Sequence, residues 1–374
     1  MKTILTTERK ALVIHSPHAG RSKYFSAALS RLQRAGVSLV DVLPVAAFIH
    51  AAEQGISWQK DGVNMLVAAG GDGLIGGVLP YAVEHSLALG ILPLGTANDV
   101  ARSLDIPQNL AAAADVLATG PLYTISIGAA YPLYPLSSLS HHQQTADASA
   151  AELLSSSRTP LSPLLFAHAL TVGLSVLFSR MATNPLVRLR YGRLTYLRSL
   201  WHAFSTYHPV EAEIHFEGIA LYERRGAQPV ISNERAILRS RIAQVTAVNA
   251  PIFWGAFEAA VPGVSLHDQL LDIVVFEHVC RPLLALRMLR FFSYLRQQTP
   301  EQPEQHEWHA RHPILFPAQR TRVPGVHHIQ ARSVTIVTPE RQQAVTLDGE
   351  IRAYTPIKAQ VADQRLQVIV PHST

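Results

Sequence analysis

The stretch that decides the fold runs from Met65 to Arg102 and reads MLVAAGGDGLIGGVLPYAVEHSLALGILPLGTANDVAR. Its apolar start, Met65–Ala69, is typical of a buried strand, and the residues from Leu74 onward are typical of a helix. The glycines between them are Gly70, Gly71 and Gly73. Because glycine has no Cβ, this loop can adopt positive φ and approach a ligand closely. We therefore expect its N–H groups and the positive end of the helix to face a phosphate at the carboxyl end of the strand.

Asp72 lies in the middle of this glycine loop. A carboxylate and a bound phosphate repel each other, so Asp72 is expected to hold a magnesium ion, a proton or a hydroxyl group. A second glycine loop, Gly95–Asn98, follows another apolar run, Ala88–Pro93. Two loops of this kind indicate a phosphate site that does not depend on the lysine of a P-loop.

Strand-like and helix-like segments alternate with short connections over the first 122 residues. The expected strands are residues 11–15, 37–42, 65–69 and 88–93, and the expected helices are residues 20–35, 45–59, 74–85, 98–104 and 109–119. This alternation predicts a parallel sheet with helices on both faces. We therefore predict an α/β domain over residues 1–122, and the family resemblance given below implies that this domain binds a nucleotide.

The pattern changes from residue 123 onward, where short strand-like runs follow one another with few helices between them. These runs are residues 124–130, 210–216, 241–248, 271–276, 333–338, 344–347 and 366–370. They predict an all-β second domain over residues 123–374, built as an antiparallel β-sandwich. Residues 131–163 are rich in Ser, Pro, His and Ala without periodicity, and we interpret them as a low-complexity surface insertion.

The 374 residues are 48% hydrophobic and 16% charged, which is typical of a folded protein with two cores. The single cysteine, Cys280, excludes an internal disulfide, and the start MKTILTTERK lacks the apolar run of a secretory signal. We therefore expect a cytoplasmic protein. The net charge of +5 favours anionic partners. Since no RNA-binding signature or zinc finger is present in the sequence, we expect peripheral contact with an anionic membrane surface and no nucleic acid.

Four further stretches have a structural and a functional interpretation. Residues 159–179 are long enough to cross a bilayer, but prolines and polar residues interrupt them, so a transmembrane helix is the minor alternative. Residues 280–297 form an arginine-bearing apolar helix that either lies on anionic lipid or, as we favour, packs on the sandwich. Residues 188–201 interleave arginines with Tyr191, Tyr196 and Trp201 and either flank a lipid cleft or cover surface. The histidines at 306, 309 and 312, near Glu307, are either metal ligands or, as we favour, part of a solvated loop, because their spacing matches no zinc pattern.

Three motifs occur along the chain: GGDG at residues 70–73, GTANDVAR at 95–102 and TLDGE at 346–350. Between the second and the third lie VPG at 261–263 and HDQLLDI at 267–273. This combination resembles the diacylglycerol kinase and sphingosine kinase superfamily, including its bacterial lipid kinases, and the likeness runs from about Leu12 to Val370. GGDG alone is weak evidence, because NAD kinases and phosphofructokinases have close variants. The three motifs in this order make the resemblance specific.

The resemblance implies an ATP-dependent kinase with a lipid acceptor and Mg²⁺. It places the ATP on residues of the glycine loops and of the first strand's end: Ser16, Gly70, Gly71, Asp72, Gly73, Gly95, Thr96 and Asn98. The favoured base is Asp72 in the sphingosine kinase branch and Asp348 in the bacterial branch, so both are candidates, and Glu350 assists through the metal or the nucleotide. A structural Mg²⁺ site is implied at Asp268, Leu270 and Asp272. An oligomer is compatible with the sequence.

Some residues depart from the family's pattern. Ser16 stands where the family often has asparagine, Gly77 replaces an acidic residue, and His267 and Gln269 replace an acidic residue and a glycine in the metal segment. A degenerate member that binds lipid or nucleotide without turnover is therefore one alternative, and an NAD-kinase-like enzyme with a soluble acceptor is another. Taken singly, three residues also have structural interpretations: a hairpin turn at Asp348, a helix N-cap at Asp99 and a strand end at Asp272.

Overall fold

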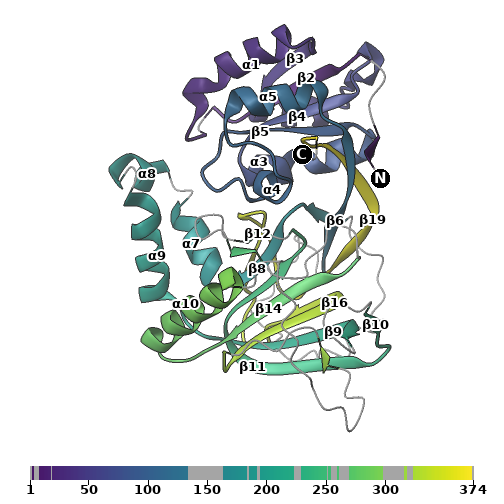
Figure 1. Ribbon diagram of the computed structural model, residues 1–374. Coiled ribbons are helices and arrows are strands. Elements are labelled where there is room, and N and C mark those ends of the chain that lie inside the picture. The colour runs from purple at the N-terminus through teal and green to yellow at the C-terminus, as the bar shows by residue number, and fades with distance from the viewer. Residues whose placement is uncertain are drawn as a thin grey trace.

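The computed structural model describes residues 2–3, 8–17, 19–133, 163–182, 185–191, 194–222, 229–250, 252–253, 259–260, 269–297, 316–317 and 323–372. An α/β region lies at one end of the molecule and an antiparallel β region at the other, as Figure 1 shows. Of the predicted insertion, only residues 131–133 and 163 are described, and the histidines at 306, 309 and 312 lie outside the described residues.

The first region is built on parallel strands in the spatial order β3–β2–β4–β5. These strands are β2 (Lys10–His15), β3 (Ser38–Pro44), β4 (Met65–Gly70) and β5 (Ala88–Pro93). Both β4 and β5 are buried along their whole length, as their apolar sequences predict. The helices of this region are α1 (Phe25–Arg34), α2 (Val45–Glu53), α3 (Asp72–Glu84), α4 (Asp99–Ser103) and α5 (Leu110–Thr119). The predicted parallel sheet is confirmed.

Two helices are shorter than predicted. The segment 20–35 begins with a 3₁₀ turn, Ser22–Tyr24, before α1 starts. The segment 45–59 divides into α2 and a second 3₁₀ turn, Trp58–Asp61. Gly55, between these two, has a φ of 74°, a conformation that ends a helix and that glycine adopts without strain.

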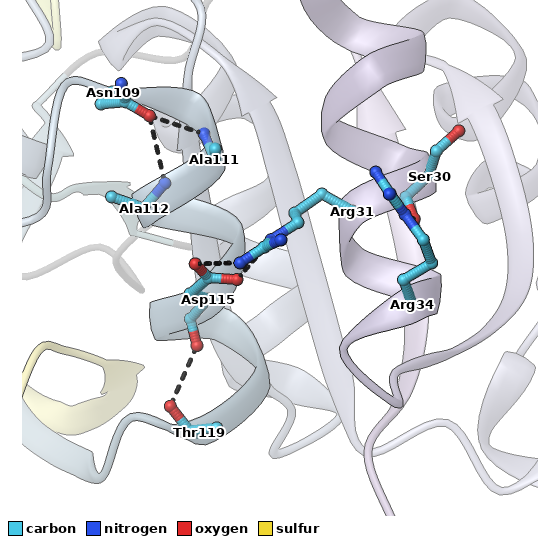
Figure 2. A network of polar contacts seen from close by, with 8 residues as sticks. All are labelled: Ser30, Arg31, Arg34, Asn109, Ala111, Ala112, Asp115 and Thr119. Carbon is cyan, nitrogen blue, oxygen red and sulfur yellow. Dashed lines mark hydrogen bonds and ion pairs between the residues drawn. The ribbon is translucent and has the colours of Figure 1, made fainter.

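Side-chain contacts hold α5 at its start and along its outer side (Figure 2). Asn109 Oδ1 accepts hydrogen bonds from Ala111 N at 2.9 Å and from Ala112 N at 3.2 Å, which caps the helix. Further along, the carboxylate of Asp115 accepts two hydrogen bonds, at 2.7 and 2.8 Å, from Arg31 of α1. The two contacts join α5 to α1 at the surface of the first region.

The second region consists of antiparallel strands. The longer ones are β6 (Leu122–Pro132), β8 (Ala169–Gly173), β9 (Val210–Tyr222), β11 (Arg235–Val248), β14 (Leu271–Glu277), β16 (Val326–Val337), β18 (Glu350–Tyr354) and β19 (Ile357–Ile369). The shorter ones are β7 (Leu164–Phe166), β10 (Val230–Ile231), β12 (Ile252–Phe253), β13 (Ala259–Ala260), β15 (Phe316–Pro317) and β17 (Ala344–Leu347). The strand β1 (Lys2–Thr3) belongs to the first region, where it pairs with the start of β6 at Tyr123 and Leu122. The pairs β9–β11, β11–β14, β14–β16 and β16–β9 close on one another around an apolar core. The predicted combination of α/β and antiparallel β structure is confirmed.

A ribbon formed by β6 and β19 runs from one region into the other (Figure 1). The last part of β19 also pairs in parallel with β5, at Val368 and Leu89. Leu366 and Val368 are buried in the core of the first region, although they come from the end of the chain. The domain division at residue 122 stays a prediction, and this strand shows that the first core is completed from the far end of the sequence.

Helices cover one side of the second region: α7 (Leu174–Ala182), α8 (Pro185–Tyr191), α9 (Thr195–Thr206) and α10 (Arg281–Gln297). In α10, Leu284, Met288 and Phe291 pack in one apolar cluster with Val274 and Phe276 of β14. The packed interpretation of this helix is thus confirmed for its inner side. Among the described residues, no helix is long and apolar enough to cross a membrane. Residues 164–182 instead form β7, β8 and α7.

Candidate active site

The loops that follow β2, β4 and β5 meet at the carboxyl edge of the parallel sheet. The N–H of Ser16, directly after β2, donates to Ala69 O of β4 at 3.1 Å. The N–H groups of Leu94 and Gly95, after β5, both donate to Gly70 O, at 2.9 and 3.1 Å. A Cβ at Gly20 would lie 3.6 Å from Thr96 Oγ1, so the loop after β2 also reaches the second glycine loop. The sequence-predicted nucleotide residues are therefore brought together.

Glycine is required in both loops because the two backbones touch. A Cβ on Gly95 would lie 2.5 Å from Gly71 Cα and 2.6 Å from Asn98 Oδ1, closer than carbon contacts allow. None of the glycines of the GGDG motif has positive φ. The expectation that this motif uses left-handed backbone is therefore wrong, and close packing is the reason for its glycines.

Asp72 begins α3 and binds the second loop. Its carboxylate accepts a hydrogen bond from Asp99 N at 3.1 Å and another from Val100 N at 3.0 Å. It thus caps the N-terminus of α4 from a distant part of the chain. The N-cap position itself is occupied by Asn98, with φ 53°, so the alternative in which Asp99 is the cap is wrong.

Asn98 has one satisfied and one unsatisfied side-chain atom. Its Nδ2 donates to Gly95 O at 3.1 Å and to Gln108 Oε1 at 3.0 Å. Its Oδ1 is buried without a hydrogen-bond partner among the described residues. A buried acceptor without a partner is costly, so Oδ1 is suited to a donor from a bound molecule.

The DGE motif forms the hairpin turn between β17 and β18. Asp348 and Gly349 have φ values of 51° and 84°, as the tightest hairpin turns require. The Asp348 carboxylate accepts hydrogen bonds from the main-chain N–H groups of Ala167 at 2.9 Å, His168 at 2.8 Å and Ala169 at 3.2 Å. Burial raises the pKa of Asp348 above its usual range, and these N–H groups oppose part of that rise.

This hairpin lies against the first turns of α3. A Cβ on Gly73 would lie 2.5 Å from Glu350 Oε1, and a Cβ on Gly76 would lie 2.7 Å from Asp348 Oδ2. Arg352 strengthens the contact, because its Nη1 donates to Gly76 O and to Leu165 O, both at 3.2 Å. The acidic turn and the glycine loop, about 275 residues apart in sequence, therefore form one site.

Gly77, which replaces the family's acidic residue, borders open space. A Cβ there would have no heavy atom within 4 Å. A larger side chain would therefore fit at this position.

His168 is a site residue that the sequence analysis did not select. Its main-chain N–H binds Asp348, and its buried ring places Nε2 at 3.9 Å from Asp99 Oδ2. Asn249 supports it by donating from its main-chain N to His168 O at 2.8 Å. His168 thus contacts both the DGE and the GTAND motifs. The sequence does contain a signal for this residue, because His168 is the only ionisable residue between 159 and 179.

The implied Mg²⁺ site at Asp268, Leu270 and Asp272 stays a prediction. Asp268 lies outside the described residues. Asp272 is buried near the start of β14, where His328 Nε2 lies 2.6 Å from its Oδ1 and Gln330 Nε2 donates to its Oδ2 at 3.1 Å. Leu270, two residues before Asp272 in the sequence, is also buried. Within the described part of the chain, no three His, Cys, Asp or Glu residues are grouped as metal ligands.

Comparison with known proteins agrees with the motifs. Residues 10–130 match the family model of the diacylglycerol kinase catalytic domain. A diacylglycerol kinase from Bacillus subtilis is 32% identical over 130 residues, which cover 32% of this chain and 41% of the relative. One from Mycobacterium tuberculosis is 33% identical over 115 residues, covering 30% of this chain and 37% of the relative. The chain therefore matches less than half the length of these relatives.

Solved structures share the whole fold. The crystal structure of a diacylglycerol kinase from Bacillus anthracis superposes over 98% of both chains with a TM-score of 0.56 and 16% identity. A second crystal structure from the same organism gives a TM-score of 0.61 and 18% identity over the same share. The fold likeness covers both regions, and the resemblance to the diacylglycerol kinase superfamily is confirmed.

Proposed function

We propose, from the diacylglycerol kinase catalytic domain at residues 10–130 and the acidic turn that meets it, that this chain is an ATP-dependent lipid kinase. It transfers the γ-phosphoryl group to a hydroxyl of a lipid such as diacylglycerol or a sphingoid base. The observation that carries the proposal is the contact of Glu350 and Asp348 with Gly73 and Gly76 of α3. It brings acidic groups to the helix N-terminus that is suited to phosphate.

The residues of the loop edge fit a nucleoside triphosphate. Asp72 and Gly73 are the first two residues of α3, and an N–H group at this position has no acceptor one turn earlier in the helix, so these two are suited to phosphate oxygens. The next two N–H groups, of Leu74 and Ile75, already donate to Gly71 O. Thr96 supplies a hydroxyl beside the first two N–H groups, and Ser16 another at the end of β2. The unpartnered Asn98 Oδ1 accepts a hydrogen bond from a hydroxyl or amino group of the nucleotide. Asp72 holds this arrangement together by fixing the second loop.

Asp348 is our candidate for the base. Its Oδ1 accepts two of its three main-chain hydrogen bonds, which leaves a lone pair of Oδ2 for the proton of the acceptor hydroxyl. Burial raises its pKa, which makes the carboxylate a stronger base than an exposed aspartate. Glu350 is exposed beside Gly73, where it would hold Mg²⁺. When bound with ATP, that ion neutralises phosphate charge.

The test is transfer of label from γ-labelled ATP to a lipid panel that includes diacylglycerol and sphingoid bases. Loss of a general base lowers turnover by about 10²–10⁴-fold, so we expect that loss in Asp348→Asn. Asp72→Asn keeps one acceptor oxygen, and we expect a smaller effect, mainly on the KM for ATP. Asp61→Asn, an exposed residue of a 3₁₀ turn, is the matched control. Wild-type turnover in a folded Asp348→Asn protein would rule out this role.

A nucleotide-binding protein without turnover is the second candidate, and Gly77 favours it. The family's carboxylate is missing there, although the position has room for one. Calorimetry decides between the two candidates: ATP binding without label transfer to any acceptor supports this one. If it is correct, Gly77→Glu is the first substitution with which to restore transfer. Transfer to a water-soluble acceptor in place of lipid would instead support the NAD-kinase-like alternative.

A further inference from the structure

The helices on the side of the second region carry arginines and no acidic residue. From Leu174 to Thr206, which includes α7, α8 and α9, the sequence contains five arginines and neither Asp nor Glu. In α10 there are four arginines, again without an acidic residue. Among the described residues, Arg180, Arg190, Arg281 and Arg290 are exposed. This side of the molecule is therefore strongly basic.

The same helices expose large apolar side chains. Leu186 of α8 is 75% exposed, and Leu194, Leu197 and Trp201 of the α9 segment are 62%, 66% and 70% exposed. Positions 194, 197 and 201 recur at helical spacing, so they form one stripe along α9. Ser199 and Ala203, on the other side of α9, are fully buried. The helix is thus folded against its neighbours and presents a second apolar face outward.

The exposed side of α10 has the same character. Leu283, Leu286 and Leu289 are exposed, whereas Leu284, Met288 and Phe291 pack toward β14. The five most exposed large apolar side chains among the described residues all lie on these helices or next to them: Leu186, Leu194, Leu197, Trp201 and Leu289. Figure 1 places α8, α9 and α10 on one side of the second region. We call the exposed residues of these three helices the helical face.

The combination of positive charge and exposed apolar side chains on the helical face indicates which kind of partner it binds. Leucine and tryptophan side chains beside arginines match a bilayer surface, where acyl chains take the apolar groups and anionic headgroups take the cations. A second copy of the chain would bring two basic surfaces together without acidic partners. Nucleic acid would match the arginines but leave the leucine stripe exposed.

The position of the face also fits a lipid acceptor. Helix α7 follows β8 directly, and the residue that opens β8, Ala169, binds Asp348 through its N–H. Helix α7 also contacts the hairpin strands β17 and β18. A bilayer on the helical face therefore lies beside the element that carries the DGE turn.

We propose that α8, α9 and the exposed side of α10 form the surface by which this chain lies on an anionic lipid bilayer. The biological role of this surface rests on the proposed function, because a lipid kinase must reach its acceptor in a membrane. Its test needs no turnover, and the two proposals can therefore fail separately.

Binding is measured by co-sedimentation with vesicles of phosphatidylcholine, alone or mixed with phosphatidylglycerol. We expect strong binding only to the anionic vesicles, weakened by salt. Leu197→Glu is expected to lower the partition coefficient by about tenfold or more, because it replaces an exposed leucine that would enter the bilayer by a carboxylate that the anionic headgroups repel. Ile237→Glu, the same kind of change at an exposed residue of β11, is the matched control and should change it by less than about twofold.

Fluorescence gives a second measurement. The emission of Trp201 should shift to the blue on addition of anionic vesicles, and Trp201→Phe should lose that shift. Equal binding to both kinds of vesicle, an equal loss in Ile237→Glu, or no shift from Trp201 would each overturn the proposal. Transfer of label to a short-chain, water-soluble acceptor separates the proposals. Leu197→Glu should retain it, and vesicle binding without any transfer would refute only the kinase.

Discussion

Asp348 combines a strained backbone, burial and three main-chain donors in one residue. Left-handed φ costs a non-glycine residue of the order of 1 kcal/mol, and burial of a carboxylate costs more. A turn that needed only shape would be satisfied by asparagine and glycine. The hydrogen bonds to Ala167, His168 and Ala169 hold the carboxylate in one orientation, which is what a base requires and a turn does not.

The stability of the protein should therefore depend on pH through Asp348. Its pKa is raised in the folded state, so its favourable contribution is complete below the unfolded value of about 3.9 and is lost as the pH rises through the folded value. Asn is neutral at every pH. The stability of wild type relative to Asp348→Asn, measured by urea unfolding, is therefore expected to fall as the pH rises above about 4.

Asp115 provides a control of opposite sign. Its hydrogen bonds with Arg31 lower the pKa of Asp115, so its contribution is present above about pH 3.9 and is lost in stronger acid. Wild type relative to Asp115→Asn should therefore lose stability as the pH falls below that value. If the two variants show the same trend against wild type, the raised pKa of Asp348 is contradicted.

At the scale of elements, the central fact is that α3 and the β17–β18 hairpin approach closely enough to exclude side chains. Gly76 and Gly77 are neighbours in α3 and differ in their surroundings. A Cβ on Gly76 would meet Asp348 Oδ2 at 2.7 Å, whereas a Cβ on Gly77 would meet nothing within 4 Å. At Gly76 the contact with the hairpin excludes a side chain, whereas at Gly77 only the helix propensity of the residue matters.

Alanine at these two positions should change stability in opposite directions. Gly77→Ala is expected to stabilise the protein by about 0.5–1 kcal/mol, because alanine is the better helix former. Gly76→Ala is expected to destabilise it by about 1–3 kcal/mol, because the hairpin must move away from α3. Urea unfolding measures both, and label transfer should fall only in Gly76→Ala. Two variants with equal stability would show that the hairpin does not press on this helix.

These elements illustrate what the sequence could and could not predict. Apolar runs such as Met65–Ala69 identified strands correctly, because local pattern decides the type of element. The reason for glycine at positions 73 and 76 could not be predicted, since it is a contact with residues at the other end of the chain. The same holds for Asp72, whose carboxylate caps a helix that begins 27 residues later. His168 was missed although it is the only ionisable residue between 159 and 179, because its contact with the DGE turn is made by its backbone and could not be inferred from its side chain.

For the whole molecule, the ribbon of β6 and β19 connects the two regions. A strand was correctly predicted over residues 366–369, but alternation of side chains does not reveal which sheet a strand joins. In the structure the same strand pairs with β16 in the second region and with β5 in the first. The DGE hairpin directly precedes it along the chain, so its placement on α3 and the closure of the first sheet are linked.

This linkage predicts that the two regions unfold together. Leu366 is 1% exposed and lies in the first core, so Leu366→Ala should cost about 2–5 kcal/mol. Hydrogen exchange should then show the same loss of protection in β4 of the first region and in β9 of the second, because a displaced β19 leaves both sheets with an unpaired edge. Gln367→Ala, at the exposed neighbouring position of β19, should leave protection unchanged in both. If Leu366→Ala lowered protection in β4 and left β9 unaffected, the regions would be independent, and the DGE turn would not depend on β19 for its position.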